Sequence, residues 1–148
     1  MSLIDQTTPS QTETISFEFD LQHSPEKVWR ALTDPVLLTE WLLPVVELRL
    51  EPEAAFTFRT HPQPGWDGTV NCRILEIEAH RKLIYSWVVG DMGLVTVVTF
   101  TLTPTASGTR LSLVQSGFKP DQKQNFGGAR YGWRMTGGKL VDLLGRIA

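Results

Sequence analysis

Cysteine, net charge and long hydrophobic runs are all scarce in this chain, and each scarcity excludes a class of protein. One cysteine among 148 residues excludes an internal disulfide and a multi-cysteine zinc site. The 14 basic and 16 acidic residues leave a formal net charge of -2, whereas nucleic-acid binders usually carry a basic excess. No apolar run approaches the roughly 18 residues of a membrane span, and the polar start lacks a signal-peptide pattern. We therefore expect a cytoplasmic protein with no nucleic-acid partner and no membrane span.

Residue types that bind metals or catalyse reactions are sparse as well. The three histidines, His23, His61 and His80, have none of the close spacings of a helical metal motif. Cys72 stands between apolar residues at alternate positions, which is typical of a buried thiol and not of an activated nucleophile. The sequence has no G-x-S-x-G, P-loop or G-x-G-x-x-G pattern. We therefore expect no metal, no cofactor and no catalytic residues.

The early part of the sequence predicts one strand followed by two short helices. Strict alternation of apolar and polar residues over Thr14–Leu21 is typical of a half-buried strand. Ser24, which precedes a proline, is suited to cap a helix, and Asp34 repeats the same signal. The second helix should end at Pro44, because proline cannot continue it.

The middle of the chain predicts an antiparallel meander. Its alternating segments are separated by short turns, and such turns join antiparallel neighbours. The apolar parity switches near Ile74, which indicates a β-bulge there. The sequence GDMG, residues 90–93, is interpreted as a hairpin turn. The expected strands span residues 46–50, 56–59, 68–78, 82–89, 94–103 and 109–114.

A long helix is predicted at the end of the chain, despite its glycines. Apolar residues recur with a helical period over residues 126–147, and the helix could begin as late as Ala129. Six glycines lie in this segment, and each costs up to about 1 kcal/mol relative to alanine in a helix interior. Packing on the sheet must therefore hold the helix. The glycines would allow a close backbone approach or leave open volume beneath the helix, and Gly137 and Gly138 could mark a kink.

This order of elements predicts an α+β fold. We expect a curved antiparallel sheet of about seven strands wrapped around the long C-terminal helix, with two short helices after the first strand. Residues 1–12 are polar and rich in breakers, so we expect a mobile N-terminal segment before a single domain over residues 13–148.

Several local motifs then resemble one family. They are SPEKVWRALTDP at 24–35, LTEW at 38–41, ILEI at 74–77, KLIYSW at 82–87, and SGF at 116–118 before a helix that carries Gly132 and Trp133. Together and in this order they resemble the AHSA-like family, named after the activator of a heat-shock-protein ATPase. This family belongs to the START/SRPBCC superfamily, whose fold is the helix-grip. The resemblance covers residues 13–147, and the glycine-rich final helix departs from the alanine and leucine expected there.

The resemblance implies a cavity between the concave sheet and the final helix, which this superfamily uses for apolar ligands. Together with the lack of a nucleophile or metal constellation, this favours a protein that binds a small apolar molecule without catalysis. One alternative is a protein-interaction module, either co-chaperone-like with a chaperone partner or homodimeric. A cavity enzyme such as a cyclase, lyase or hydrolase is a third hypothesis, and fold alone does not choose among them. Arg59, His61, Tyr85 and Asp91 are the polar residues that such an enzyme could use.

Inward-facing aromatic and apolar residues are the candidate ligand site. Side chains of this kind are as often plain core as cavity wall. Among polar candidates, Gln115 could orient a ligand and Arg130 could pair with an acidic group, although a solvated arginine is the commoner case. Trp66, in a loop, should lie at the cavity mouth or on the surface. The predicted cavity residues are Trp41, Phe56, Phe58, Cys72, Ile74, Tyr85, Trp87, Val98, Phe100, Leu113, Arg130, Trp133 and Leu140.

Overall fold

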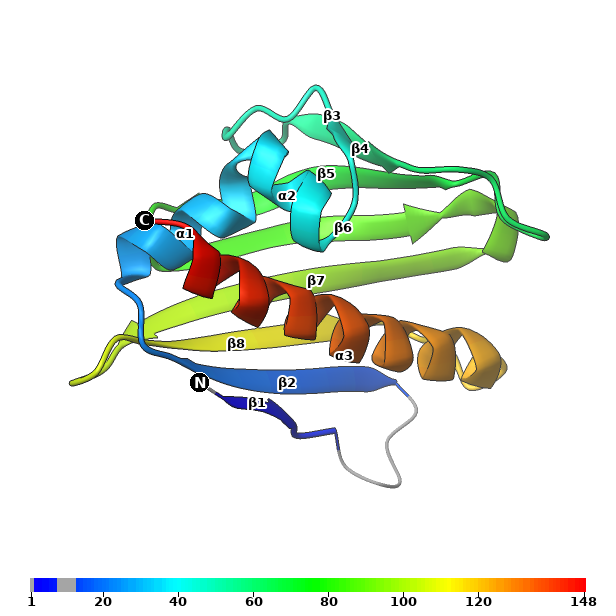
Figure 1. Ribbon diagram of the computed structural model, residues 1–148. Helices are drawn as coiled ribbons and strands as arrows, with labels where there is room; N and C mark the ends of the chain where they lie inside the picture. Colours follow the sequence, from blue (N-terminus) through cyan, green and yellow to red (C-terminus); the bar gives the residue numbers. More distant parts are fainter. Residues whose placement is uncertain (1, 8–12) are drawn as a thin grey trace.

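One antiparallel sheet carries all three α-helices on the same face (Figure 1). The computed structural model describes residues 2–7 and 13–148, and for Ser2 and Asp91 it describes the backbone alone. The eight strands lie in the order β1-β2-β8-β7-β6-β5-β4-β3. The strands are β1 Ser2–Asp5, β2 Thr14–Leu21, β3 Val45–Val46, β4 Ala55–Arg59, β5 Thr69–Glu78, β6 Lys82–Val89, β7 Leu94–Pro104 and β8 Thr109–Ser116. The helices are α1 Pro25–Thr33, α2 Pro35–Trp41, the 3-10 turn η1 Gly90–Met92, and α3 Lys123–Arg146.

The predicted α+β helix-grip arrangement is confirmed, with eight strands instead of about seven. The added strand is β1, whose residues pair antiparallel with the 17–20 segment of β2. The strand expected over residues 46–50 is shorter than its alternation predicts, because only the two residues of β3 pair with β4. Within the described residues no helix is long and apolar enough to cross a bilayer.

The N-terminal residues differ from the mobile lead-in that the sequence predicts. Ser2–Asp5 is a regular edge strand, and beyond it the Gln6 N–H donates to the Ser16 carbonyl at 2.7 Å. A four-residue strand among turn formers leaves little pattern in a sequence, because its pairing with β2 decides its structure. The prediction for residues 1 and 8–12 lies outside the described part of the chain.

Both short helices begin where their capping residues predict. Ser24 Oγ accepts the Lys27 N–H at 3.2 Å at the start of α1, and Asp34 Oδ1 accepts the Val36 N–H at 2.9 Å at the start of α2. These side chains satisfy backbone donors that have no partner inside the helix. α2 ends at Trp41, a few residues before Pro44.

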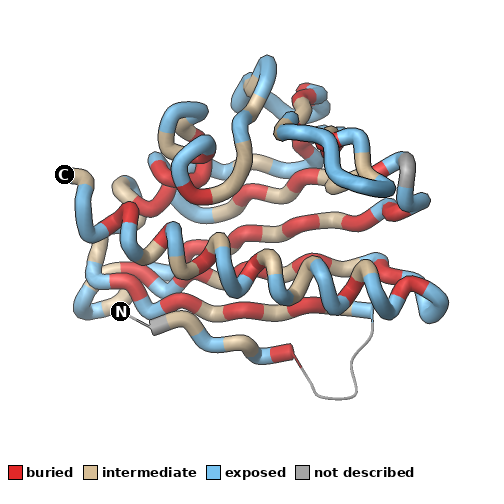
Figure 2. Tube along the Cα trace, turned by 45° about the vertical axis from the view of Figure 1, so that its right-hand side comes forward, coloured by how far each residue is buried: buried red, intermediate tan, exposed pale blue. Residues whose placement is uncertain are grey.

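Along the strands, buried residues alternate with half-buried or exposed ones (Figure 2). On β2 the inner face consists of Ile15, Phe17, Phe19 and Leu21, each at most 1% exposed. The predicted bulge is confirmed, because the β5–β6 register shifts between Ile74 and Glu76.

α3 is one continuous helix of 24 residues, and it begins earlier than its apolar pattern predicts. Its C-terminal half buries Leu140, Leu143 and Leu144, and the helix as a whole contacts α1, α2, β1 and β2. Its N-terminal half, up to Arg134, buries Phe126 and Trp133 among the described residues. The sheet and helix are therefore tightly packed at one end, and the other end has room for a cavity.

Candidate functional site: a cavity beneath the N-terminal half of α3

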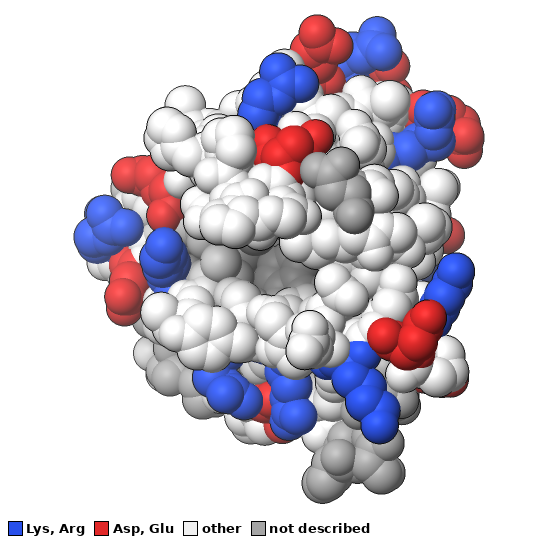
Figure 3. Space-filling view, turned by 90° about the vertical axis from the view of Figure 1, so that its right-hand side faces the viewer, with Lys and Arg blue, Asp and Glu red and all other residues white. Residues whose placement is uncertain are grey.

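A cavity of about 400 Å³ lies between the sheet and the N-terminal half of α3. It occupies the end of the sheet where the β6–β7 hairpin turns through η1, and it opens to solvent there. Figure 3 shows this end as a hollow bordered mainly by uncharged side chains, with charged side chains of both signs around them. The lining residues are Leu42, Leu43, Trp66, Val70, Trp87, Val89, Met92, Leu94, Gln115, Gln124, Asn125, Gly128, Ala129, Gly132, Trp133 and Thr136.

One face of α3, with two glycines at its centre, forms the roof of the cavity. Gln124, Gly128, Gly132 and Thr136 are spaced four apart, so they share one helix face, and all four line the cavity. A Cβ added at Gly128 or Gly132 would meet no atom within 4 Å. Glycine at these positions leaves open the volume that a larger side chain would fill.

Gly137, one turn farther along, has the opposite role. A Cβ added there would lie 3.1 Å from two ring carbons of Phe19. Glycine at this position lets the helix approach β2 closely. Both sequence-based explanations for the glycines therefore apply, at different positions along α3.

Three tryptophans supply most of the aromatic surface of the cavity. The rings of Trp87 on β6 and Trp133 on α3 are in contact, with centroids 5.5 Å apart and planes inclined by 53°. Trp66 lies in the β4–β5 loop, and its indole N–H donates to the Thr69 carbonyl at 3.0 Å. This bond fixes Trp66 on the cavity wall.

A buried polar chain holds the inner wall in place. Trp133 Nε1 donates to Gln115 Oε1 at 2.7 Å, Gln115 Nε2 donates to Thr96 Oγ1 at 2.9 Å, and Thr96 Oγ1 donates to the Trp87 carbonyl at 2.9 Å. Gln115 is 2% exposed and Thr96 is 1% exposed. Linked hydrogen bonds in such a low-dielectric setting strengthen one another and make the wall rigid.

The family assignment follows from sequence and structure comparison. Residues 22–145 match the family described as Activator of Hsp90 ATPase homolog 1-like protein. The chain belongs to this family. Protein MLL2253 from Mesorhizobium loti is 40% identical, with a TM-score of 0.83 over 91% of this chain and 98% of that one. Protein CV1439 from Chromobacterium violaceum is 27% identical, with a TM-score of 0.73 over 90% of this chain and 98% of that one.

Two further comparisons add to this picture. Protein NE0264 from Nitrosomonas europaea is 24% identical with a TM-score of 0.75, and it covers 94% of this chain and 99% of that one. At that identity it supports the fold alone. No curated protein matches the chain in sequence.

In this AHSA1-like chain, titratable groups are absent from the cavity lining among the described side chains. Arg59 and His61 are exposed, and Tyr85 is buried in the core with its pKa raised well above its ordinary value by burial. Asp91 has no described side chain. Burial likewise raises the pKa of the Cys72 thiol, so it stays protonated and is no nucleophile. Within the described residues, groups of His, Cys, Asp and Glu that could hold a metal are also absent.

Of the predicted cavity residues, the structure brings Trp87 and Trp133 to the cavity. The other apolar residues of this set lie deeper, in the packed core. Phe56, Phe58, Ile74 and Tyr85 surround a void of about 10 Å³, which is too small for a ligand. Trp41 is 1% exposed and donates to the Ala31 carbonyl at 2.8 Å. Cys72, Val98, Phe100, Leu113 and Leu140 are core residues at most 5% exposed.

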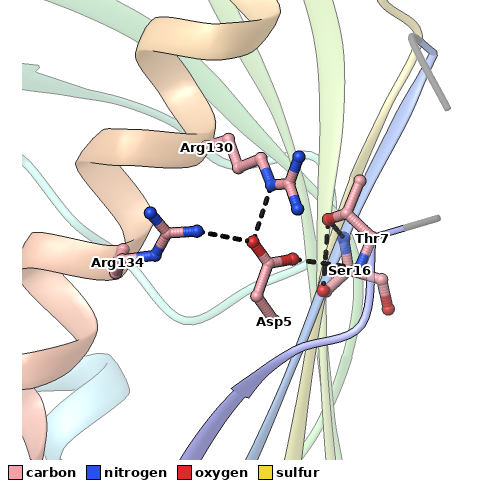
Figure 4. A network of polar contacts seen from close by, with 5 residues as sticks. All are labelled: Asp5, Thr7, Ser16, Arg130 and Arg134. Atoms are coloured by element: carbon pink, nitrogen blue, oxygen red, sulfur yellow. Dashed lines mark hydrogen bonds and ion pairs between the residues drawn. The ribbon is translucent and has the colours of Figure 1, made fainter. Parts of the chain in front are cut away.

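Arg130 also lies away from the cavity. Its Nε donates to Asp5 Oδ2 at 2.6 Å, and Arg134 Nη2 donates to the same oxygen at 2.9 Å (Figure 4). The Thr7 N–H donates to the other Asp5 oxygen at 2.9 Å. Burial opposes ionisation of Asp5, but these bonds outweigh it and lower its pKa to about 2. Arg130 therefore fastens α3 to the strand β1, and its charge is neutralised by the protein itself.

Most of the lining was missed because the sequence predicts which face of a strand points inward but not where along it a cavity lies. The missed strand residues, Val70, Val89 and Leu94, are inner-face residues at the ends of their strands. The polar residue Gln115 was a candidate, and it is on the wall. On α3, the i, i+4 spacing of Gly128 and Gly132 was the signal that could have located the roof.

Proposed function

We propose that this protein binds a small hydrophobic molecule in the cavity between the sheet and α3, without catalysing a reaction. The main observation behind this proposal is a cavity of about 400 Å³ whose lining is mostly apolar and uncharged. Pockets for small ligands have volumes of roughly 300–1,000 Å³ and apolar walls with a few polar groups. Family membership supports the proposal, because ligand cavities occur in this superfamily.

A pair of glycine variants on α3 tests the proposal. Gly132→Leu places a side chain into the cavity, whereas Gly127→Leu places the same side chain on the exposed surface of the same helix. Both changes raise helix propensity by up to about 1 kcal/mol, so neither should unfold the protein. The uncharged fluorophore N-phenyl-1-naphthylamine, which brightens in apolar surroundings, is the probe.

We expect the wild-type protein and Gly127→Leu to bind the probe with similar affinity. Gly132→Leu should bind it with at least tenfold lower affinity. Equal binding by all three proteins would place the probe elsewhere and contradict the proposal. Absence of binding to the wild-type protein, together with no small molecule released on denaturation and detected by mass spectrometry, would also contradict it.

One observation favours a protein-binding role as the second candidate. Tyr131 and Met135 lie one turn apart on the outer surface of α3, and they are 62% and 51% exposed. Exposed large apolar side chains can mark contact sites. A chaperone pull-down and a light-scattering measurement of molar mass, each repeated with Tyr131→Ser and Met135→Ser, test this role. Monomeric behaviour and no recovered chaperone would count against it.

A further inference from the structure

We propose that the cavity selects an uncharged aromatic molecule whose oxygen acceptor binds the indole N–H of Trp87. This inference rests on the proposed function, since it specifies the ligand of the same cavity. Three properties of the described lining carry it: its charge, its aromatic surface and one hydrogen-bond donor.

The described lining side chains carry no charge that could pair with a charged group on a ligand. Its polar side chains are Gln115, Gln124, Asn125 and Thr136, all uncharged. The nearby ion pairs of α3 involve Asp5, which already accepts from two arginines outside the cavity. Removing a carboxylate or ammonium from water without a partner costs several kcal/mol. The cavity should therefore disfavour acids and amines.

The start of α3 works against this exclusion of acids. The first turn of α3 lies at the cavity mouth, where Gln124 and Asn125 contribute to the lining. Free N–H groups at a helix start favour an anion. An anionic probe that is otherwise matched to a neutral one decides between these effects.

The aromatic lining favours a flat ring. Trp66, Trp87 and Trp133 come from a loop, a strand and a helix, and they line one volume. Aromatic rings gain roughly 0.5–1.5 kcal/mol from offset or edge-on contacts beyond simple burial. A cavity of about 400 Å³ walled by three indoles is thus better suited to a compact ring system than to a long acyl chain.

The donor is the indole nitrogen of Trp87. Trp66 donates to Thr69 and Trp133 donates to Gln115, so both of their N–H groups are used within the protein. Trp87 is half-buried and lines the cavity, and its Nε1 makes no hydrogen bond to any residue that the structure describes. Trp87 Nε1 is not among the buried polar atoms that lack a partner, so solvent reaches it, and a ligand that displaces this solvent must offer an acceptor in its place. A ligand oxygen, such as a ketone, would supply that acceptor.

Three naphthalenes with one ring and nearly one shape test the inference. They are 2-acetylnaphthalene, which has a carbonyl acceptor, 2-ethylnaphthalene, which has none, and 2-naphthoate, which carries a negative charge. Binding to the ¹⁵N-labelled protein is followed by the indole N–H signals and by the amide signals of Gly128 and Gly132. Trp87→Phe removes the donor and keeps a ring, and Trp66→Phe is the matched control because its donor is already used.

We expect the ketone to bind roughly two- to tenfold more tightly than the hydrocarbon, the range that one hydrogen bond supplies. The Trp87 indole signal should move downfield with the ketone alone. Trp87→Phe should abolish the preference for the ketone over the hydrocarbon. Trp66→Phe should weaken the binding of both neutral ligands but leave this preference unchanged. The naphthoate should bind weaker than the ketone by on the order of a hundredfold or more.

Other results overturn the inference and are distinguishable from failure of the proposed function. Equal affinity for ketone and hydrocarbon, or a preference that survives Trp87→Phe, would exclude Trp87 as the donor. Naphthoate binding as tight as the ketone would exclude selection for uncharged molecules. If no naphthalene binds while N-phenyl-1-naphthylamine still does, the inference fails and the proposed function stands. If the cavity signals respond to neither, both fail.

Discussion

Gln115 joins the two tryptophans that meet at the inner end of the cavity. Its side chain accepts from Trp133 and donates to Thr96, which in turn donates to the Trp87 carbonyl. Each amide atom of Gln115 thereby satisfies a buried partner. Removing it leaves a tryptophan N–H without an acceptor in a region that water reaches poorly.

We predict that Gln115→Leu lowers the free energy of unfolding by about 1–3 kcal/mol, the cost of an orphaned buried donor. The indole N–H signal of Trp133 should move upfield in the same variant. Gln124→Leu, an exposed change on the same cavity, should shift stability by less than about 0.5 kcal/mol. Chemical denaturation measures both, and a Gln115→Leu protein as stable as the wild type would contradict the role of this chain.

Asp5 makes the stability depend on pH at the acid end. Its pKa is lowered to about 2 from the ordinary value of 3.8, so the folded state favours the carboxylate. The stabilisation is therefore fully present above pH 4 and is lost as the pH falls through 2.

We predict that Asp5→Asn lowers the free energy of unfolding by about 1–2 kcal/mol at pH 7, an amount reduced by solvent screening at the half-exposed Arg134. The difference from the wild type should shrink between pH 4 and pH 2. Asp142→Asn, on the exposed surface of α3, should change stability little at any pH. A difference for Asp5→Asn that is independent of pH would exclude the ion-pair explanation.

At the scale of elements, α3 combines a tightly packed C-terminal half with an open N-terminal half. Two adjacent glycines let the packing be tested without disturbing the cavity. Gly137 faces Phe19 at close range, whereas a Cβ at Gly138 would meet nothing within 4 Å. Neither residue lines the cavity.

We predict that Gly138→Ala stabilises the protein by up to about 1 kcal/mol through helix propensity. Gly137→Ala should stabilise the protein less than Gly138→Ala or destabilise it, because its methyl group meets the ring of Phe19, which is 1% exposed. The difference between the two variants in thermal or chemical unfolding is the measurement. Equal stabilisation by both would show that α3 does not pack closely on β2 at Gly137.

Some helices and strands could be predicted from the sequence and others could not. Caps at Ser24 and Asp34, strand alternation and the bulge at Ile74 are local signals, and each predicted its element correctly. The start of α3 at Lys123 and the strand Ser2–Asp5 depend on contacts with distant segments, which a local pattern does not record.

The candidate site was harder to predict for a related reason. Alternation places Tyr85 and Trp87 on one face of β6, and both do point inward. Only the three-dimensional packing shows that Tyr85 lies among other rings and Trp87 beside open volume. The pairing of Arg130 with Asp5 joins residues 125 positions apart and could not be predicted from either segment.

At the scale of the whole molecule, ligand binding and stability are linked. A molecule that binds the folded state alone raises the free energy of unfolding by RT ln(1 + [L]/Kd), which is about 1.4 kcal/mol at ten times Kd. We predict this gain for wild-type protein with 2-acetylnaphthalene and expect none for Gly132→Leu. Thermal unfolding at several ligand concentrations measures it. An equal gain in both proteins would mean that the ligand binds outside the cavity.

The most direct measurement is a crystal structure of the wild-type protein soaked with 2-acetylnaphthalene. We predict ligand density in the cavity between the three tryptophans and the roof at Gly128 and Gly132, with the carbonyl oxygen within hydrogen-bond distance of Trp87 Nε1. A cavity closed by the side chains of Trp66 and Met92, or ligand density confined to another surface, would contradict the assignment of a ligand site to this AHSA1-like protein.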